Sequence, residues 1–171
     1  MKNLTKTLIL AIVMITFSAN AFSQFSANTT ANATATVVTP IAIAQTADLA
    51  FGTFTVGVVG GTVQVTTAPA RVASADITVL GTSTFSPAAF SVTGTTGATY
   101  AITLPANGTV TIANGANTIA VNNFVSNPAV GSNPALAAGA NALVVGATLV
   151  VGASQVAGPY TGTFSVTVGY N

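Results

Sequence analysis

Few side chains in this sequence could carry out acid–base or nucleophilic chemistry. The chain has no histidine, cysteine or glutamate, and its two lysines, Lys2 and Lys6, both lie at its start. Catalytic groups that pair serine with histidine or lysine, or cysteine with histidine, therefore cannot form in the rest of the chain. Asp48 and Asp76 are the only carboxylate side chains, and a carboxylate pair could in principle hydrolyse a glycoside.

The neighbours of the two aspartates favour structural roles. Asp48 precedes Leu49-Ala50-Phe51, where we expect a turn, and Asp76 is expected to pair with Arg71. Two isolated carboxylates do not supply the clustered oxygens that calcium needs, and zinc sites built on cysteine are excluded. We predict that the chain is not an enzyme, with no catalytic, cofactor-binding or metal-binding residue and no cofactor.

The first residues are typical of a signal peptide. Lys2 and Lys6 give a positive start, the apolar run from Leu8 to Phe17 follows, and Ala19-Asn20-Ala21 supplies the small residues that signal peptidase requires. The run is shorter than the about 20 residues that a membrane-spanning helix needs. We predict a signal peptide over residues 1–21, or cleavage after Ser23, and a protein exported to the periplasm, cell surface or extracellular space.

Removal of this leader leaves a chain with almost no charge. Asp48, Arg71 and Asp76 are then its charged side chains, with a net side-chain charge of −1. Without a basic surface, nucleic-acid binding is not expected, and we predict no stable membrane insertion. Low charge removes a barrier to self-association, so the composition favours contact with further copies or with another surface subunit. A monomer with an adhesive surface would have the same composition.

Alternation of apolar and polar residues, the pattern of half-buried β-strands, runs through the chain. It is clearest at the end, where threonine and serine separate an apolar set that we expect to face the core: Tyr160, Phe164, Val166, Val168 and Tyr170. Other alternating sets are Val63 and Val65; Tyr100, Ile102 and Leu104; and Leu143, Val145, Ala147, Leu149 and Val151. Ile119, Val121 and Phe124 fit the pattern if one extra residue bulges at Asn122-Asn123.

Turn residues divide these runs. Asn107-Gly108 predicts a two-residue hairpin, and Asn114-Gly115 predicts another. Residues 135–142 are rich in alanine, but Gly139 interrupts them and we interpret them as a loop. Short strands with such turns predict an all-β fold, an antiparallel β-sandwich of immunoglobulin-like or pilin-like type, over residues 37–171.

Residues 22–36 form an N-terminal extension of different composition. From residue 25 to residue 35, its apolar members lie on one side of an extended chain, and they are Phe25, Ala27, Ala31, Ala33 and Ala35. The extension is interpreted either as a flexible tail or as an assembly strand that completes a sheet, in its own domain or in a neighbouring subunit.

Two stretches carry a resemblance to a known family. One is Val37-Val38-Thr39-Pro40-Ile41 running into Leu49-Ala50-Phe51-Gly52-Thr53-Phe54, and the other is the ending from Gly158 to Val168. Together they resemble the bacterial secreted family catalogued as domain of unknown function 4402, from about Ala33 to Asn171. The resemblance implies an exported β-sandwich and no established activity.

A looser similarity runs to chaperone–usher pilins and to domains of the spore coat U type. It is carried by Phe51-Gly52-Thr53, by Gly158 and Tyr160 before the last strand, and by the penultimate Tyr170. In those proteins the domain lacks one strand, and the N-terminal extension of a neighbour fills the groove. The similarity implies a pilin-like last strand that includes Gly158, Tyr160, Phe164, Val166, Val168 and Tyr170. The chain departs from the pattern because it lacks the pilin cysteines and because its extension offers mostly alanine.

Three functions compete on these observations. The first is a non-enzymatic, exported structural subunit of a cell-surface or fimbria-like assembly. The alternative is a stand-alone secreted or surface binding module of unknown ligand. A small outer-membrane β-barrel ranks third, because no paired aromatic girdles can be picked out.

The leader generates a direct prediction. Intact-mass measurement of the exported protein should find a chain that begins at Phe22 or Gln24, because signal peptidase cuts after small residues. An exported species that still carries Met1 or Lys2 would contradict the export argument.

Overall fold

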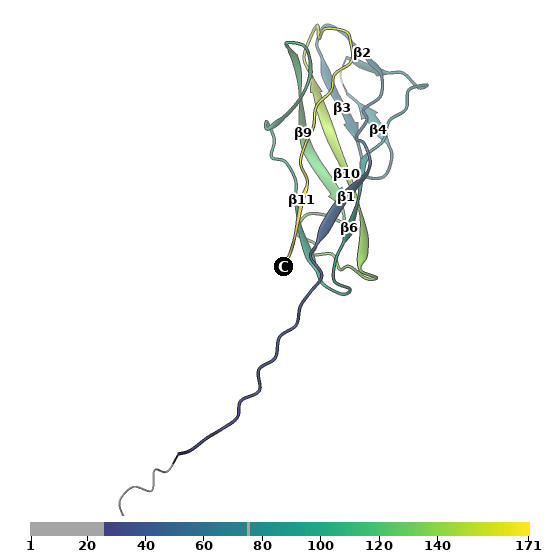
Figure 1. Cartoon of the computed structure of the whole chain (residues 1–171). Coiled ribbons are helices and arrows are strands. Elements are labelled where there is room, and N and C mark those ends of the chain that lie inside the picture. The colour runs from purple at the N-terminus through teal and green to yellow at the C-terminus, as the bar shows by residue number, and fades with distance from the viewer. Residues whose placement is uncertain (1–25, 75) are drawn as a thin grey trace, which may run out of the picture. The chain divides into compact units, whose positions relative to one another are not determined.

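The computed structural model describes residues 26–74 and 76–171, so the predicted leader and Phe25 lie outside the described residues. The chain divides into two units, residues 1–36 and 37–171. In the first unit, the described residues 26–36 form no strand and are exposed to solvent. All the strands belong to the second unit (Figure 1).

The described part of residues 37–171 contains β-strands, turns and loops but no helix, and every strand pair is antiparallel. The predicted all-β antiparallel fold is therefore confirmed. In chain order the strands are β1 (Ala42–Ala47), β2 (Phe54–Val56), β3 (Gly61–Val65), β4 (Arg71–Ala73), β5 (Ile77–Val79), β6 (Ala88–Thr93), β7 (Tyr100–Thr103), β8 (Val110–Asn114), β9 (Asn117–Asn127), β10 (Ala140–Val151) and β11 (Thr167–Tyr170).

The 12-residue β10 is the central strand of the main sheet. Along one edge, its first half pairs with β6 and its second half with β3, while β9 pairs along the other edge. The sheet continues from β6 to β1, from β3 to β4, and from β9 to β8. The change of partner from β6 to β3 occurs at Gly146, where an added Cβ would collide with the carbonyl of Val65, so only glycine fits there.

Two smaller sheets, β7 with β11 and β2 with β5, pack against the main sheet. They close two neighbouring clusters of buried side chains. The first cluster is Val63, Ile77, Ile119, Val121, Ala147, Leu149 and Val151. The second is Ala88, Val92, Tyr100, Ile102, Leu136, Leu143 and Val145. The predicted inward face of β10 contributes to both clusters, so that prediction is confirmed.

The predicted bulge in β9 is also confirmed. Opposite β10, the pairing jumps from Asn122 to Val125 on β9 while it advances from Thr148 to Gly146 on β10. Asn123 lies in the bulge with a positive φ of 50°. The extra residue returns Phe124 to the side of the strand that packs against the core.

The hairpin predicted at Asn107-Gly108 is wrong. The two residues do form a turn, but the strands beside it, β7 and β8, pair with β11 and β9 and not with each other. The turn is held by the bulge instead, since Gly108 N–H donates to Asn122 Oδ1 at 2.8 Å and Asn123 N–H donates to Asn107 Oδ1 at 2.7 Å. The hairpin predicted at Asn114-Gly115 does occur, displaced by one residue, because Gly115-Ala116 joins β8 to β9.

Residues 135–142 are not entirely a loop, because β10 begins at Ala140. Leu136, within the same stretch, is fully buried, and its N–H and C=O bond to Ala98 and Gly97. The alanine-rich composition gave no indication that Leu136, a large apolar residue, packs in the second cluster and holds this connection against it.

The predicted core-facing side of the C-terminal segment is confirmed, although the strand itself is shorter than predicted. Phe164, Val166, Val168 and Tyr170 pack against the second cluster and Tyr160 against the first, whereas the intervening threonines and serine are exposed. Ladder pairing begins only at Thr167, so residues 162–166 lie outside any strand.

This face can be tested by substitution. Val166→Asp places a charge against the second cluster and should lower the unfolding free energy by about 1–3 kcal/mol. Thr167→Asp, on the exposed side of β11, is the matched control and should be tolerated. The measurement is chemical denaturation, and the opposite ranking of the two variants would show that the assigned faces are reversed.

Tyr100 gives a second test, because it is buried (0% exposed) and its hydroxyl has no hydrogen-bond partner among the described residues. Burial raises the pKa of this hydroxyl above its ordinary value of 10.0. The folded protein therefore keeps the proton at pH values where the unfolded chain has lost it. The contribution of Tyr100 to the unfolding free energy is therefore fully present below pH 10.0 and is lost as the pH rises above that value.

We expect Tyr100→Phe to match or exceed the natural chain in stability at neutral pH, by up to about 1 kcal/mol, because it removes an unsatisfied buried hydroxyl. It should also reduce the loss of stability above pH 10.0. Unfolding free energies measured across that pH range check both points, and parallel pH profiles for the two proteins would contradict the second.

Candidate functional site

The charged side chains of the second unit serve local structure. Asp48 follows a bulge in β1, and its Oδ1 accepts a hydrogen bond of 2.6 Å from the Gln45 side-chain amide. Asp76 Oδ2 accepts one of 3.2 Å from the backbone N–H of Val59. Asp48 therefore stabilises the end of β1, and Asp76 holds the segment between β2 and β3. Among the described residues, no three histidine, cysteine, aspartate or glutamate side chains gather as metal ligands.

Arg71 does not bond to Asp76, and the expected ion pair is wrong. The guanidinium Nη1 donates to the carbonyl of Phe51 at 3.1 Å and to the Ser83 hydroxyl at 2.9 Å, and Nη2 donates to the carbonyl of Leu80 at 2.7 Å. It also lies over a phenylalanine ring, 5.0 Å from the ring centroid. Two backbone carbonyls and a hydroxyl thus occupy the donors of the guanidinium fork. Arg71 therefore has a structural role, because it joins β4 to the segments that contain Phe51 and Leu80.

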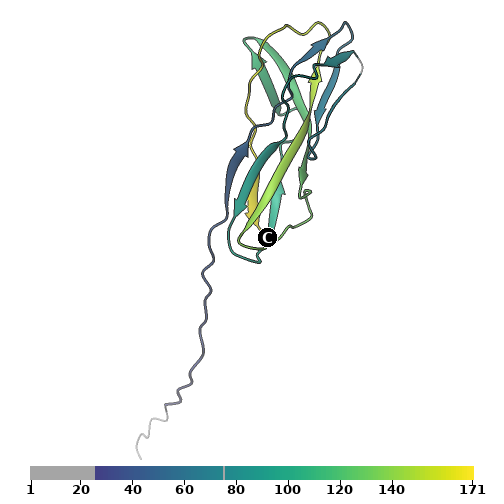
Figure 2. The same cartoon turned by 90° about the vertical axis from the view of Figure 1, so that its right-hand side faces the viewer.

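The feature that chemistry-based reasoning did not find is a pair of free strand edges. Among the described strands, β1 pairs only with β6 and β11 pairs only with β7, yet β1 and β11 lie close together. Figure 2 shows β1 at the outside of the main sheet, beside β6. We call the region between β1 and residues 162–170 the open seam.

The backbone on the C-terminal side of the open seam is largely unpaired. Thr161 exchanges hydrogen bonds with Ala113 of β8, and Thr167 begins the ladder to β7. Between them, residues 162–166 make no backbone–backbone hydrogen bond with any described residue. Their N–H and C=O groups are thus available to a partner, since unpaired backbone groups at a strand edge template the pairing of further strands.

Half-buried apolar side chains lie along the open seam. On the β1 side these are Ile41 and Ile43, and on the other side Phe164, Val166 and Val168. Phe164 links them to the interior, because its ring meets that of Phe90 edge-on at 6.5 Å between centroids and that of Phe124 at 5.1 Å. The seam therefore combines free backbone groups with an incompletely covered apolar surface.

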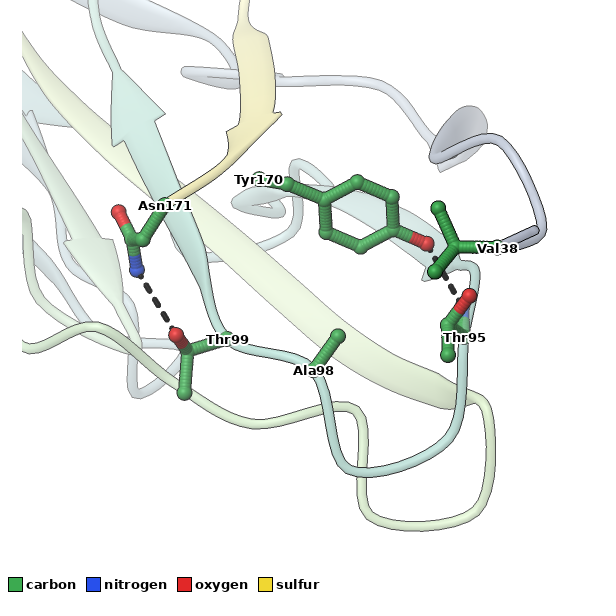
Figure 3. Close-up of a pocket in the computed structure, with 6 residues that line it drawn as sticks. All are labelled: Val38, Thr95, Ala98, Thr99, Tyr170 and Asn171. Atoms are coloured by element: carbon green, nitrogen blue, oxygen red, sulfur yellow. Dashed lines mark hydrogen bonds between the residues drawn. The ribbon is translucent and has the colours of Figure 1, made fainter. Parts of the chain in front are cut away.

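Tyr170 closes one end of the seam. Its hydroxyl donates to the carbonyl of Thr39 at 2.7 Å. It also accepts from Thr95 N–H at 2.6 Å (Figure 3). Thr39 N–H in turn donates to Thr95 Oγ1 at 2.9 Å. The residue at position 94 must be glycine, since a Cβ there would collide with the Tyr170 hydroxyl. This network ties the start of β1 to the end of β11.

A small cavity of about 330 Å³ lies beside this network, lined by Val38, Thr95, Ala98, Thr99, Tyr170 and Asn171 (Figure 3). Most of its accessible lining is apolar, with threonine and tyrosine hydroxyls and the amide of Asn171 at its border. Two of those groups already bond to each other, as Asn171 Nδ2 donates to Thr99 Oγ1 at 3.1 Å. The cavity could accept a small uncharged polar molecule but offers no reactive group.

The residues expected to act in assembly separate into two groups. Phe164, Val166, Val168 and Tyr170 border the open seam, while Gly158 and Tyr160 lie near β8, where Tyr160 donates to the carbonyl of Val156 at 2.8 Å. Ala27, Ala31, Ala33 and Ala35 are exposed and carry no strand, and Phe25 lies outside the described residues. The sequence did not indicate Ile41, Ile43 or Thr95, because their role depends on the distant C-terminal segment.

Comparison with known proteins gives one family. Searches of curated proteins and of solved structures found no match. The looser similarity to pilins is accordingly not supported by any of these comparisons. A family model described as a domain of unknown function (DUF4402) matches residues 41–170, a range that contains all the strands from β1 to β11. The chain therefore belongs to the DUF4402 family.

Proposed function

We propose that this chain is a non-enzymatic, exported structural subunit that associates, without covalent bonds, with copies of itself or with another surface subunit. The observation that carries the proposal is the open seam, in which free backbone edges and half-buried apolar side chains occur together. Natural proteins guard such edges with lysine or other charges. No charged residue lies in β1 or in residues 162–170.

The charge distribution supports the same role. Residues 37–171 carry three charged side chains, Asp48, Asp76 and Arg71, so few charges are present to keep copies apart. Large apolar side chains are also exposed in the connecting segments, with Val37 96% and Val58 83% exposed. Such exposure is unfavourable for a monomer in water and is relieved by association.

A stand-alone binding module remains the second candidate, on the basis of the cavity beside Tyr170. A mostly apolar lining bordered by threonine, tyrosine and asparagine groups could bind a small uncharged polar ligand. The two functions differ in what the purified protein does alone, because a binding module of this kind would stay monomeric.

Sedimentation velocity of the exported protein over a range of concentrations tests the proposal. We expect multimers whose size is insensitive to salt, since few charges contribute to the contact and screening has little to act on. A monomer at every concentration would contradict self-association. Sedimentation after mixing with extracts of the cell envelope would then test whether the chain associates with another surface subunit.

Deletion of residues 25–35 separates the possible roles of the N-terminal extension. Loss of multimers with a folded monomer remaining is the expected result, because the segment lies outside the family domain. A monomer with a lowered melting temperature would show instead that the segment is an internal strand. No change in either property would identify it as a tail without a role in assembly.

A further inference from the structure

We infer that two copies of this chain pair through the outer face of the main sheet, the side that points away from the two core clusters; this inference rests on the proposed function and names one of its contacts. The clusters contain the inward side chains of β10, which are Leu143, Val145, Ala147, Leu149 and Val151. Because side chains alternate along a strand, the residues between them belong to the outer face. These residues are Val144, Gly146, Thr148 and Val150.

The strands beside β10 continue this face with small or neutral side chains. The cross-strand neighbours of Val144, Thr148 and Val150 on β6, β3 and β9 are Ala89, Asn127, Gln64, Asn122, Thr62 and Ala120. Each of these side chains is uncharged. The outer face is therefore a mixture of apolar and neutral polar groups across several strands.

The only charge in the seven strands of the main sheet, all of which the structure describes, lies on the other side. This charge belongs to Arg71 of β4, which is paired with the buried Val65 and is therefore on the inward side. Its guanidinium bonds to the carbonyls of Phe51 and Leu80. A contact through the outer face would thus bury no charged side chain of the main sheet, and the buried centres of protein interfaces are depleted in charge.

The centre of the outer face is low, and its surroundings are raised. Gly146 has no side chain, and the neighbouring Thr148 is only 8% exposed. Val150 and Val125, which lie beside this centre, are 41% and 43% exposed. Two sheets that pack face to face lie about 10 Å apart with interdigitating side chains. The valines of one copy could therefore cover the low centre of the other.

The size of the outer face suits a specific contact. β10 has 12 residues and, at about 3.3 Å per residue, is about 40 Å long. The sheet widens from β1, β6 and β10 at the start of this strand to β4, β3, β10, β9 and β8 near its end. At about 4.8 Å between strands its mean width is about 20 Å, which gives roughly 800 Å². Specific interfaces bury about 800 Å² on each partner.

A second copy is the occupant because the outer face is complementary to itself. Two identical faces without charge do not repel each other, whereas a partner with a charged surface would lose hydration and gain no ion pair. The open seam lies at an edge of the main sheet and the outer face on one side of it, so both contacts can form in one multimer.

Sedimentation velocity of the full chain tests this contact with Val150→Lys and a matched control, Val130→Lys. Val130 is 56% exposed in the connection from β9 to β10, outside the outer face. Val150→Lys should weaken self-association at least about tenfold, because each pair of copies would bury lysine charges without partners. Val130→Lys should associate as the natural chain does. If the two variants associate equally, whether normally or weakly, the outer face is not the contact.

Thiol labelling decides the matter even if Val150→Lys fails to fold. The chain has no natural cysteine, so Val150→Cys and Val130→Cys each supply a single thiol. When multimers form, a maleimide should react several-fold more slowly with Val150→Cys than in dilute monomer, and at an unchanged rate with Val130→Cys.

The opposite results are distinct. Multimers in which Val150→Cys reacts as fast as in the monomer would overturn the outer face and leave the proposed function intact. Slowing that appears only after an extract of the cell envelope is added would overturn the second copy as occupant. A natural chain that stays monomeric would overturn this inference together with the self-association on which it rests.

Discussion

The pairing of β10 is the constraint on which the rest of the structure depends. This strand bonds to β6, β3 and β9, and its buried side chains contribute to both core clusters. A shift of one residue in any of these ladders would turn its apolar side chains to solvent, so the register of three partners is fixed together. Gly146 permits the arrangement, since any Cβ there would push β3 away from the strand. With no disulfide possible, stability rests on this packing alone.

The open seam is a consequence of how the partners of β10 are distributed. Because β6 and β3 share one edge of β10, the strands beyond them, β1 and β4, become outer strands of the main sheet. The C-terminal segment belongs to another sheet through β7, so β1 and β11 approach each other with no strand in common. The side-chain bonds of Tyr170 bring the two together where no ladder does. The junction of the two sheets is thus closed at one end and unpaired along its length.

The sequence revealed which way side chains face better than which strands pair. Alternation in Leu143–Val151 and in Phe164–Tyr170 predicted the buried faces correctly because it depends only on neighbouring residues. The hairpin at Asn107-Gly108 failed because the competing bond acceptor, Asn122, lies far along the chain. Arg71 was misassigned for the same reason, since its carbonyl partners come together only in the fold. No local sequence pattern indicates the open seam, because residues 41–47 and 162–170 are far apart in the sequence and meet only in the fold.

The scarcity of charge has a different meaning for a monomer and for a subunit. In a monomer, exposed residues such as Val37 and Val59 and the uncharged edge of β1 would leave the protein poorly protected against aggregation. In an assembly the same surface lies at contacts, where a charge without a partner would lose its hydration. The three charged side chains of the domain bond to groups within it and lie outside β1 and residues 162–170. In the proposed assembly, neighbouring subunits would cover this surface, and unpaired backbone groups would contribute more to the contact than charged side chains.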